Sequence, residues 1–507
     1  MKWAAKAGMV DPSIPNHLII AYEPECASLS VLYDMFDNGL LTFKFNFIIY
    51  YLKKKIFILF EMITNESSAK QEKAPGATKV KDEKKESEDE KKRLLRTGDA
   101  YIMLDLREGT TDIACHEIKG PFEVKELLAP SGGAWGSYYI DKTFEFMLIE
   151  IFGSDHMNEF KAIHPGKYRE LMSNFERNKC DFFKDEYNNS NSNSNNSVSK
   201  PGKARPKFHS VTLPIEFDIF MQGKYEDIEQ VVNDFQFYGK PCQIQYIATC
   251  LRMSHEVWMK MFDDLIDLII VHTTTLINTN AELLKHKLKC ICLVGGFSKS
   301  EYLHKRITDE FAAHYHIFLP RYHILSVVDG AARIGKISNF VKSRIVNKTY
   351  GVSRAVHVLE ATNSGVSADH IQNHKFTTSD GQEFVNNCFD VFIRKGEEIN
   401  VDQVVEHEFG SSKVEWWGSS FDYIDTTTIY SSDEKNPLVV SGLKPLATLY
   451  IRLPRELQSN KLKVSNRFYF GNTTLRVTTL ITTTDGKCIE KEVYLDYDYS
   501  IEKPSIH

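Results

Sequence analysis

An apolar strand in the first half of the chain ends in Asp105, passes Gly109 and Thr110, and returns through Asp112. A strand, a tight turn and a second strand can offer backbone amides and a hydroxyl to a phosphate, while the carboxylates hold a hydrated magnesium ion. Taken alone, the segment fits an ordinary β-hairpin with a polar turn better than a ligand site. Its chemical meaning therefore depends on what else the chain contains.

A second segment of this kind follows later in the chain. An apolar run at 290–294 leads into Gly295, Gly296, Phe297 and Ser298, and then into a helical pattern. Two glycines at a strand-to-helix turn let the backbone approach a ligand closely, and the start of a helix favours negative charge. The alternative is a tight turn that binds nothing.

The order and spacing of these segments resemble the actin-like ATPase domain of heat-shock 70 kDa proteins, most closely the heat shock 70 kDa protein 12 family. The most specific match is Ser-Gly-Gly-Ala-Trp-Gly-Ser at 131–137. Leu-Ile-Ile-Ala-Tyr-Glu-Pro at 18–24, Leu-Val-Gly-Gly-Phe-Ser at 293–298 and Thr-Tyr-Gly-Val at 349–352 extend the likeness in the same order. It covers most of the chain outside residues 30–99 and an Asn/Ser-rich loop.

The resemblance implies a site for ATP or ADP with magnesium. Glu23 and Asp105 would take the catalytic roles, and Asp105 and Asp112 would hold the metal through water. The residues implied to bind the nucleotide are Gly109, Thr110, Gly132, Gly133, Glu176, Lys179, Gly295, Gly296 and Ser298. For Glu176 and Lys179, an exposed ion pair on a helix face, worth little energy, is a strong alternative.

The chain departs from the family pattern inside the implied phosphate loop. The family's Asp-x-Gly-Gly-Gly-Thr reads here as Asp-Leu-Arg-Glu-Gly-Thr at 105–110, so Arg107 and Glu108 replace two glycines. Arg107 could attract phosphate, but Glu108 would repel it, and both side chains take space that the backbone needs. We expect a weak or inactive ATPase.

The family also begins with a first phosphate loop, Asp-x-Gly-Thr-Thr, and no such segment precedes Glu23. The resemblance thus implies a chain truncated at its start, with an incomplete first lobe. Phosphoryl transfer depends mainly on positioning and charge stabilisation, so half a cleft should catalyse poorly.

Composition places the chain among globular proteins with balanced charge. There are 62 basic and 68 acidic residues, which gives no indication of nucleic-acid binding. An odd number of scattered cysteines, nine, favours a reducing compartment, and we expect a cytoplasmic protein. Lys44 and the lysines at 53–55 interrupt the apolar stretch at 40–63, so a membrane-spanning helix is the less favoured interpretation.

The fold class expected is α/β, an actin-like ATPase fold with an incomplete first lobe, followed by a mainly antiparallel β-sandwich. Residues 1–30 would be a remnant of the first lobe, and 31–99 an insertion with a charged linker. Residues 100–340 would form the second lobe, with the Asn/Ser-rich loop at 186–202, and 348–500 the β-sandwich. The last region resembles, more weakly, the heat-shock peptide-binding domain, here without a helical lid.

Three functions are compatible with these features. The first is an atypical heat-shock 70 kDa type protein that binds nucleotide weakly and acts through contacts with protein or peptide clients. The second is an ATP-hydrolysing chaperone. The third is a structural interaction protein whose cleft binds no nucleotide. The sequence predicts no particular client and no oligomeric state.

Overall fold

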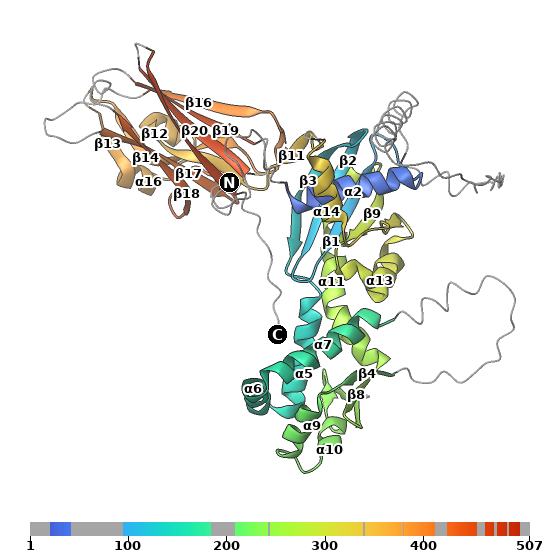
Figure 1. The fold of residues 1–507 in the computed structure, drawn as a ribbon. Helices are drawn as coiled ribbons and strands as arrows, with labels where there is room; N and C mark the ends of the chain where they lie inside the picture. Colours follow the sequence, from blue (N-terminus) through green and yellow to red (C-terminus); the bar gives the residue numbers. More distant parts are fainter. Residues whose placement is uncertain are drawn as a thin grey trace, which may run out of the picture. The chain divides into compact units, whose positions relative to one another are not determined.

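The computed structural model describes residues 21–41, 95–183, 208–241, 244–337, 340–378, 380–410, 423–453, 462–470, 474–483 and 486–496 (Figure 1). The chain divides into two compact units. The first contains residues 1–26, 114–131 and 331–500, and the second contains 27–113, 132–330 and 501–507. Residues 42–94 of the insertion predicted at 31–99, and the Asn/Ser-rich loop at 186–202, lie outside the described residues, whereas residues 31–37 are helical. Within the described ranges, no helix is long and apolar enough to cross a membrane.

Parallel strands form the centre of the second unit. β1 (Ala100–Leu106) pairs in parallel with β9 (Leu288–Val294), which pairs in parallel with β10 (His316–Phe318). All seven residues of β1 are buried, as expected for a strand covered on both faces. The strand order of this sheet is β10-β9-β1-β2-β3, where most residues of β2 (Thr111–Gly120) and β3 (Glu123–Gly133) belong to the first unit. The predicted strand, turn and strand around Asp105 are confirmed.

Helices make up most of the remaining second unit. They include α5 (Tyr138–Phe152), α6 (Ser154–Ile163), α7 (Pro165–Asp181), α9 (Ile215–Gln222), α10 (Ile228–Asn233), α11 (His255–Thr279), α12 (Ala281–Leu284) and α13 (Glu301–Phe311). In the sequence, Trp258, Phe262, Leu265, Ile266 and Ile269 recur at helical spacing, which predicts a helix. That helix is α11, and it begins where the Ser254 side chain accepts a hydrogen bond from Val257 N. Phe175 stacks between Phe144 and Trp258, with ring centroids 3.9 and 5.1 Å away. These rings join α5, α7 and α11 in one core.

Smaller elements complete the second unit. A three-stranded antiparallel sheet has the order β4-β8-β7, from β4 (Phe208–Thr212), β8 (Cys250–Ser254) and β7 (Ile244–Ile247). β5 (Gln236–Phe237) pairs with β6 (Lys240–Pro241). The 3-10 turn η1 (Phe297–Lys299) follows β9. Helices α2 (Glu23–Asp37) and α14 (Ser326–Ile334) each contribute residues to both units.

The first unit is dominated by two antiparallel sheets. One has the order β13-β14-β12-β17-β18, and the other has the order β16-β19-β20-β21. The strands are β12 (Thr349–His357), β13 (Lys375–Thr377), β14 (Glu383–Ile393), β16 (Val404–Gly410), β17 (Tyr423–Ser432), β18 (Pro445–Leu453), β19 (Leu462–Tyr469), β20 (Thr474–Thr483) and β21 (Cys488–Asp496). α15 (Val358–Asn363) and α16 (Ala368–His374) lie between β12 and β13. The sequence Asp380-Gly381 is a turn signal, and Gly381 takes a φ of +83°.

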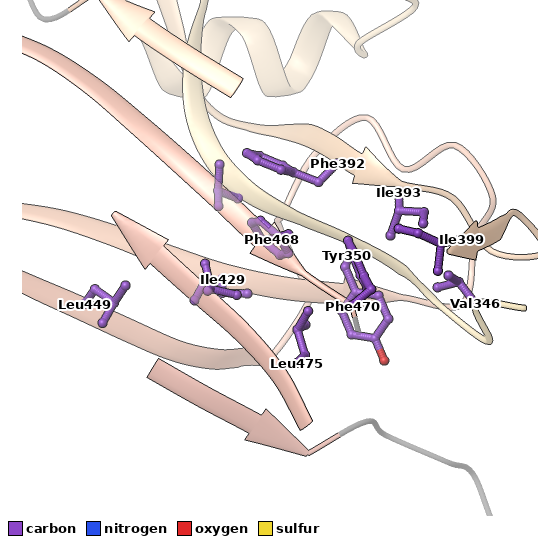
Figure 2. Packing of buried hydrophobic residues seen from close by; sticks show 12 residues of the cluster. Val346, Tyr350, Phe392, Ile393, Ile399, Ile429, Leu449, Phe468, Phe470 and Leu475 are labelled. Atoms are coloured by element: carbon purple, nitrogen blue, oxygen red, sulfur yellow. The ribbon is translucent and has the colours of Figure 1, made fainter. Parts of the chain in front are cut away.

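Residues from both sheets share one apolar core (Figure 2). Tyr350 of β12 and Ile429 of β17 come from the first sheet, and Phe468 of β19 and Leu475 of β20 come from the second. The Phe392 ring lies 4.2 Å from that of Phe468, measured between centroids. Alternating apolar residues in these strands thus bury one face of each sheet. The whole chain is a mixed α/β structure with several sheets.

A short strand before β12 carries buried charge. β11 (Ser343–Ile345) pairs antiparallel with β15 (Glu398–Asn400), and Arg344 in its middle donates to Glu25 Oε1 from Nε at 2.9 Å and Nη2 at 2.5 Å. Ile345 N donates to Glu126 Oε2 at 3.0 Å. Burial raises the pKa of Glu126 to about 8, and burial followed by the Arg344 charge lowers the pKa of His116 to about 4.

Candidate functional site

The two segments singled out by the sequence meet at the carboxyl ends of adjacent strands. Asp105 of β1 is in register with Val294 of β9, and Gly295 follows directly. Gly295 has a φ of +88°, and a Cβ there would lie 2.3 Å from the Leu106 carbonyl oxygen and 2.8 Å from Asp105 Oδ1. Only glycine allows this approach. The structure therefore brings Asp105 and Gly295, predicted from separate motifs, into contact.

Arg107 reaches back to both carboxylates that the sequence assigns to magnesium. Its Nε donates to Asp105 Oδ2 at 3.0 Å, and its Nη2 lies 2.9 Å from the same oxygen and 2.6 Å from Asp112 Oδ2. The Asp105 side chain is fully buried, whereas those of Arg107 and Asp112 are about 30% exposed. Charge-assisted bonds from a planar guanidinium to carboxylates are strong and directional. The guanidinium thus holds the two carboxylates together.

The predicted phosphate loop also supports the start of α5. The backbone amides of Ser137 and Tyr138 donate to the carbonyls of Arg107 and Glu108 at 3.1 and 2.8 Å. The first amides of a helix need acceptors, and Ser137 gives no side-chain cap here. A Cβ at Gly136 would lie 2.0 Å from the Glu108 carbonyl oxygen. The loop is therefore packed against the motif at 131–137.

Close packing at positions 132 and 133 leaves no room for a side chain, so glycine is required at both positions. A Cβ at Gly132 would lie 2.1 Å from the Thr111 carbonyl oxygen, and one at Gly133 would lie 2.3 Å from the Trp135 ring. The Thr111 hydroxyl in turn donates to the Trp135 carbonyl at 2.9 Å. This packing explains the motif without a ligand, and the nucleotide-binding role of the two glycines stays a prediction.

Lys179 is engaged in a buried ion pair. Its Nζ lies 2.7 Å from each carboxylate oxygen of Asp141 and 3.2 Å from the Ser137 carbonyl oxygen. Burial raises the pKa of the Asp141 carboxyl, and the Lys179 charge opposes that rise. Glu176, one turn away on α7, is exposed. The sequence allowed an exposed ion pair between Glu176 and Lys179. In the structure, Lys179 of α7 instead pairs with Asp141 in the first turn of α5.

Ser298 forms a small network at the start of η1. Its hydroxyl donates to the Gly295 carbonyl at 2.6 Å and lies 2.7 Å from His323 Nδ1. Gly295 N donates to the His323 carbonyl at 2.9 Å. Burial is the main cause that lowers the pKa of His323. Gly296, by contrast, has open space where a Cβ would stand.

Sequence patterns did not indicate three contacts of this site. They are the pairing of Asp141 with Lys179, the contact of His323 with Ser298, and the bonds of Arg107 to Asp105 and Asp112. Asp141 offered one signal, since it is an acidic residue in the first turn of a helix. His323 offered none, because it comes from a loop far along the chain. Glu23 begins α2 in the other compact unit, and its catalytic role, like that of Asp105, stays a prediction.

The arrangement fits hydrated magnesium poorly. Magnesium keeps several waters and uses carboxylates as direct or water-mediated ligands. Here the Arg107 guanidinium occupies one oxygen of each carboxylate, Asp105 Oδ2 and Asp112 Oδ2, so a water-mediated ion would have to compete with it for these two oxygens. No group of three or more His, Cys, Asp or Glu side chains suited to a metal occurs among the residues that the structure describes.

Comparison with known proteins agrees with the likeness seen in the motifs. No family model matches the chain. It is 25% identical to heat shock 70 kDa protein 12A of Mus musculus over 507 aligned residues, which cover 95% of this chain and 66% of that protein. It is also 25% identical to the Homo sapiens protein 12A, over 94% of this chain and 65% of that protein. To the Homo sapiens protein 12B it is 25% identical, over 62% of this chain and 42% of that protein.

At 25% identity, these relatives make the chain similar to heat-shock 70 kDa type proteins, and within that class to the heat shock 70 kDa protein 12 family. It spans about two thirds of the length of the curated 12A proteins that it matches.

Proposed function

We propose that this chain is an atypical heat-shock 70 kDa type protein that binds adenine nucleotide weakly or not at all and acts through contacts with other proteins. The proposal includes an actin-like arrangement of the nucleotide region and a peptide-binding type of β-sandwich after it. The observation that carries it is the state of the phosphate loop, where Arg107 and Glu108 stand in place of glycines and Arg107 is bound to Asp105 and Asp112.

A phosphate loop works by presenting backbone amides at close range, without side chains between them and the ligand. Glu108 adds a negative charge where phosphate oxygens would come, which opposes binding. Lys179, which the resemblance implies in nucleotide binding, has its ammonium group held by Asp141. Nucleotide would therefore have to compete with ion pairs that already exist in the protein.

Contacts with protein clients are supported by the outer strands of the two antiparallel sheets. β13 and β18 are outermost in one sheet, and β16 and β21 in the other. Each carries an exposed large apolar residue: Phe376, Tyr450, Val404 and Tyr494, with 37 to 67% of their surface exposed. An extended peptide can add to such an edge through main-chain hydrogen bonds, with apolar side chains providing selectivity.

A cytoplasmic setting is part of the same proposal. The described cysteines, among them Cys115, Cys290 and Cys292, are free thiols. Free, buried thiols suit a reducing compartment, where structural disulfides are rare.

The ATP-hydrolysing chaperone remains the second candidate because one element of the expected site is well formed. Asp105 and Gly295, which the resemblance assigns to the same site, meet at adjacent strand ends. A third candidate, an interaction protein with no nucleotide site at all, has the same protein contacts.

Steady-state turnover of ATP with magnesium, measured with and without an extended apolar peptide, tests the proposal. We expect no turnover above that of a matched Asp105→Asn variant, together with peptide binding that ATP does not change. Turnover that requires Asp105 and increases with peptide would establish the chaperone instead. Absence of binding to a degenerate extended-peptide library would contradict the client part of the proposal.

A further inference from the structure

Arg107 places a single guanidinium on both the Asp105 and the Asp112 carboxylates. The two carboxylates are seven residues apart, and the guanidinium joins them across the turn between β1 and β2. Its side chain is 30% exposed, so the pair with Asp112 faces solvent, while the bond to Asp105 lies inside. The Arg107 guanidinium thus contacts one buried carboxylate and one partly exposed carboxylate.

The electrostatic balance favours a single cation at this point. Two carboxylates held close together repel each other unless a positive charge lies between them. With Arg107 in place, the three groups carry a net charge of −1; without it, the net charge is −2. A divalent ion would need to displace a guanidinium whose bonds are charge-assisted and partly shielded from water.

We propose that Arg107 is a built-in replacement for the divalent cation, which closes this site to magnesium. Any nucleotide or other polyphosphate that enters the site does so without a metal ion. The inference concerns the site of the proposed function, and it goes further by stating the form of ligand that the site admits. Removal of the guanidinium should open the same carboxylates to a divalent ion.

The test is titration of the full chain with Mn²⁺, a spectroscopic substitute for magnesium, followed by electron paramagnetic resonance of the free ion. Five proteins are compared: wild type, Arg107→Gln, Asp112→Asn, Arg107→Gln with Asp112→Asn, and Arg169→Ala as a control from an exposed position on α7. Glutamine keeps hydrogen-bonding groups at position 107, which helps the loop to fold. Circular dichroism confirms that each protein is folded.

Wild type and Arg169→Ala should bind Mn²⁺ equally weakly. Arg107→Gln should bind one ion about tenfold or more tighter, because the net charge facing the ion changes from −1 to −2. The added Asp112→Asn change should abolish that gain. Since no nucleotide or peptide is present, the result is independent of whether the chain binds either.

Two results would overturn the inference. One is tight binding of Mn²⁺ to wild type that a single Asp112→Asn change removes, because the site would then already admit a metal. The other is a folded Arg107→Gln variant with wild-type affinity, because the guanidinium would then not be what keeps the ion out. If Arg107→Gln does not fold, the comparison of wild type with Asp112→Asn alone decides.

Discussion

At the residue scale, the buried ion pair between Lys179 and Asp141 affects the stability of the folded chain. Lys179 and Asp141 are largely buried, with side-chain exposures of 8 and 17%. A buried ion pair adds little net stability over an apolar pair, but loss of one partner leaves a charge without compensation. The pair therefore positions α7 against the start of α5, but it adds little net stability to the folded chain.

Lys179→Met should lower the free energy of unfolding by about 3 kcal/mol, because Asp141 would be left buried without its cation. The double variant with Asp141→Leu should lose clearly less than the single variant, since both charges are gone. Urea denaturation followed by fluorescence measures both. Equal losses in the single and double variants would show that the pair does not act as described.

Glu126 provides a pH-dependent prediction. Its pKa is raised from 4.5 to about 8 in the folded chain, mainly by burial, so the folded state binds an extra proton between these values. Its contribution to stability is complete at low pH and is lost as pH rises through about 8, by up to about 1.4 kcal/mol per pH unit. Glu126→Gln keeps an acceptor for Ile345 N and removes the titration.

The difference in unfolding free energy between Glu126→Gln and wild type should therefore increase steadily from pH 5 to pH 8, in favour of the variant. His116, whose pKa is lowered to about 4, has the opposite slope below pH 6.5, but it is present in both proteins and cancels. Thermal unfolding across this pH range is the measurement. A difference that does not change with pH would mean that Glu126 is ionised in the folded protein.

At the scale of elements, the turn from β9 into η1 shows how two neighbouring glycines differ. Gly295 lies against Leu106 and Asp105 with a positive φ, whereas Gly296 has a φ of −66° and open space beside it. Gly295→Ala should destabilise the chain by about 2 kcal/mol or more through overpacking and backbone strain.

Gly296→Ala is the matched control, and it should change stability by no more than about 0.5 kcal/mol. Chemical denaturation of the two variants side by side gives the comparison. If both substitutions are equally harmless, the close approach of β9 to the end of β1 is not as described.

Sequence patterns were sufficient for elements whose apolar periodicity is local. They predicted α11 from its helical spacing, the strand with Asp105, and mainly antiparallel strands after residue 348. The site was predicted less completely. Asp105 and Gly295 were assigned to one site only through the resemblance, and the partners of Arg107 and Lys179 depend on side-chain directions that spacing does not define. The predicted domain boundaries and site roles stay predictions.

At the scale of the whole molecule, the region after residue 348 has its own apolar core. Val346, directly after β11, also packs into this core. Val346 belongs to that core, Val346 N donates to the Glu397 carbonyl at 3.0 Å, and Gly396 N donates to the Val346 carbonyl at 2.7 Å. The predicted independent domain at 348–500 omits these contacts. Residues just before 348 thus add contacts to this region, and the predicted boundary itself stays a prediction.

A fragment of residues 340–500 should be more stable than one of 348–500 by about 3 kcal/mol, from burial of Val346 and two backbone hydrogen bonds. Both should unfold cooperatively in urea. Val346→Ala in the longer fragment should remove part of the difference and serves as its control. Identical midpoints for the two fragments would show that residues 340–347 contribute nothing.

The central claim is that charged side chains in the phosphate loop prevent tight binding of nucleotide. Calorimetric titration of ATP with magnesium into wild type and into the double variant Arg107→Gly with Glu108→Gly tests it most directly. We predict weak or undetectable binding to wild type, and an affinity about tenfold or more higher in the double variant, whose backbone amides are then accessible. Equal affinities in the two proteins, or micromolar binding with turnover by wild type, would contradict the claim.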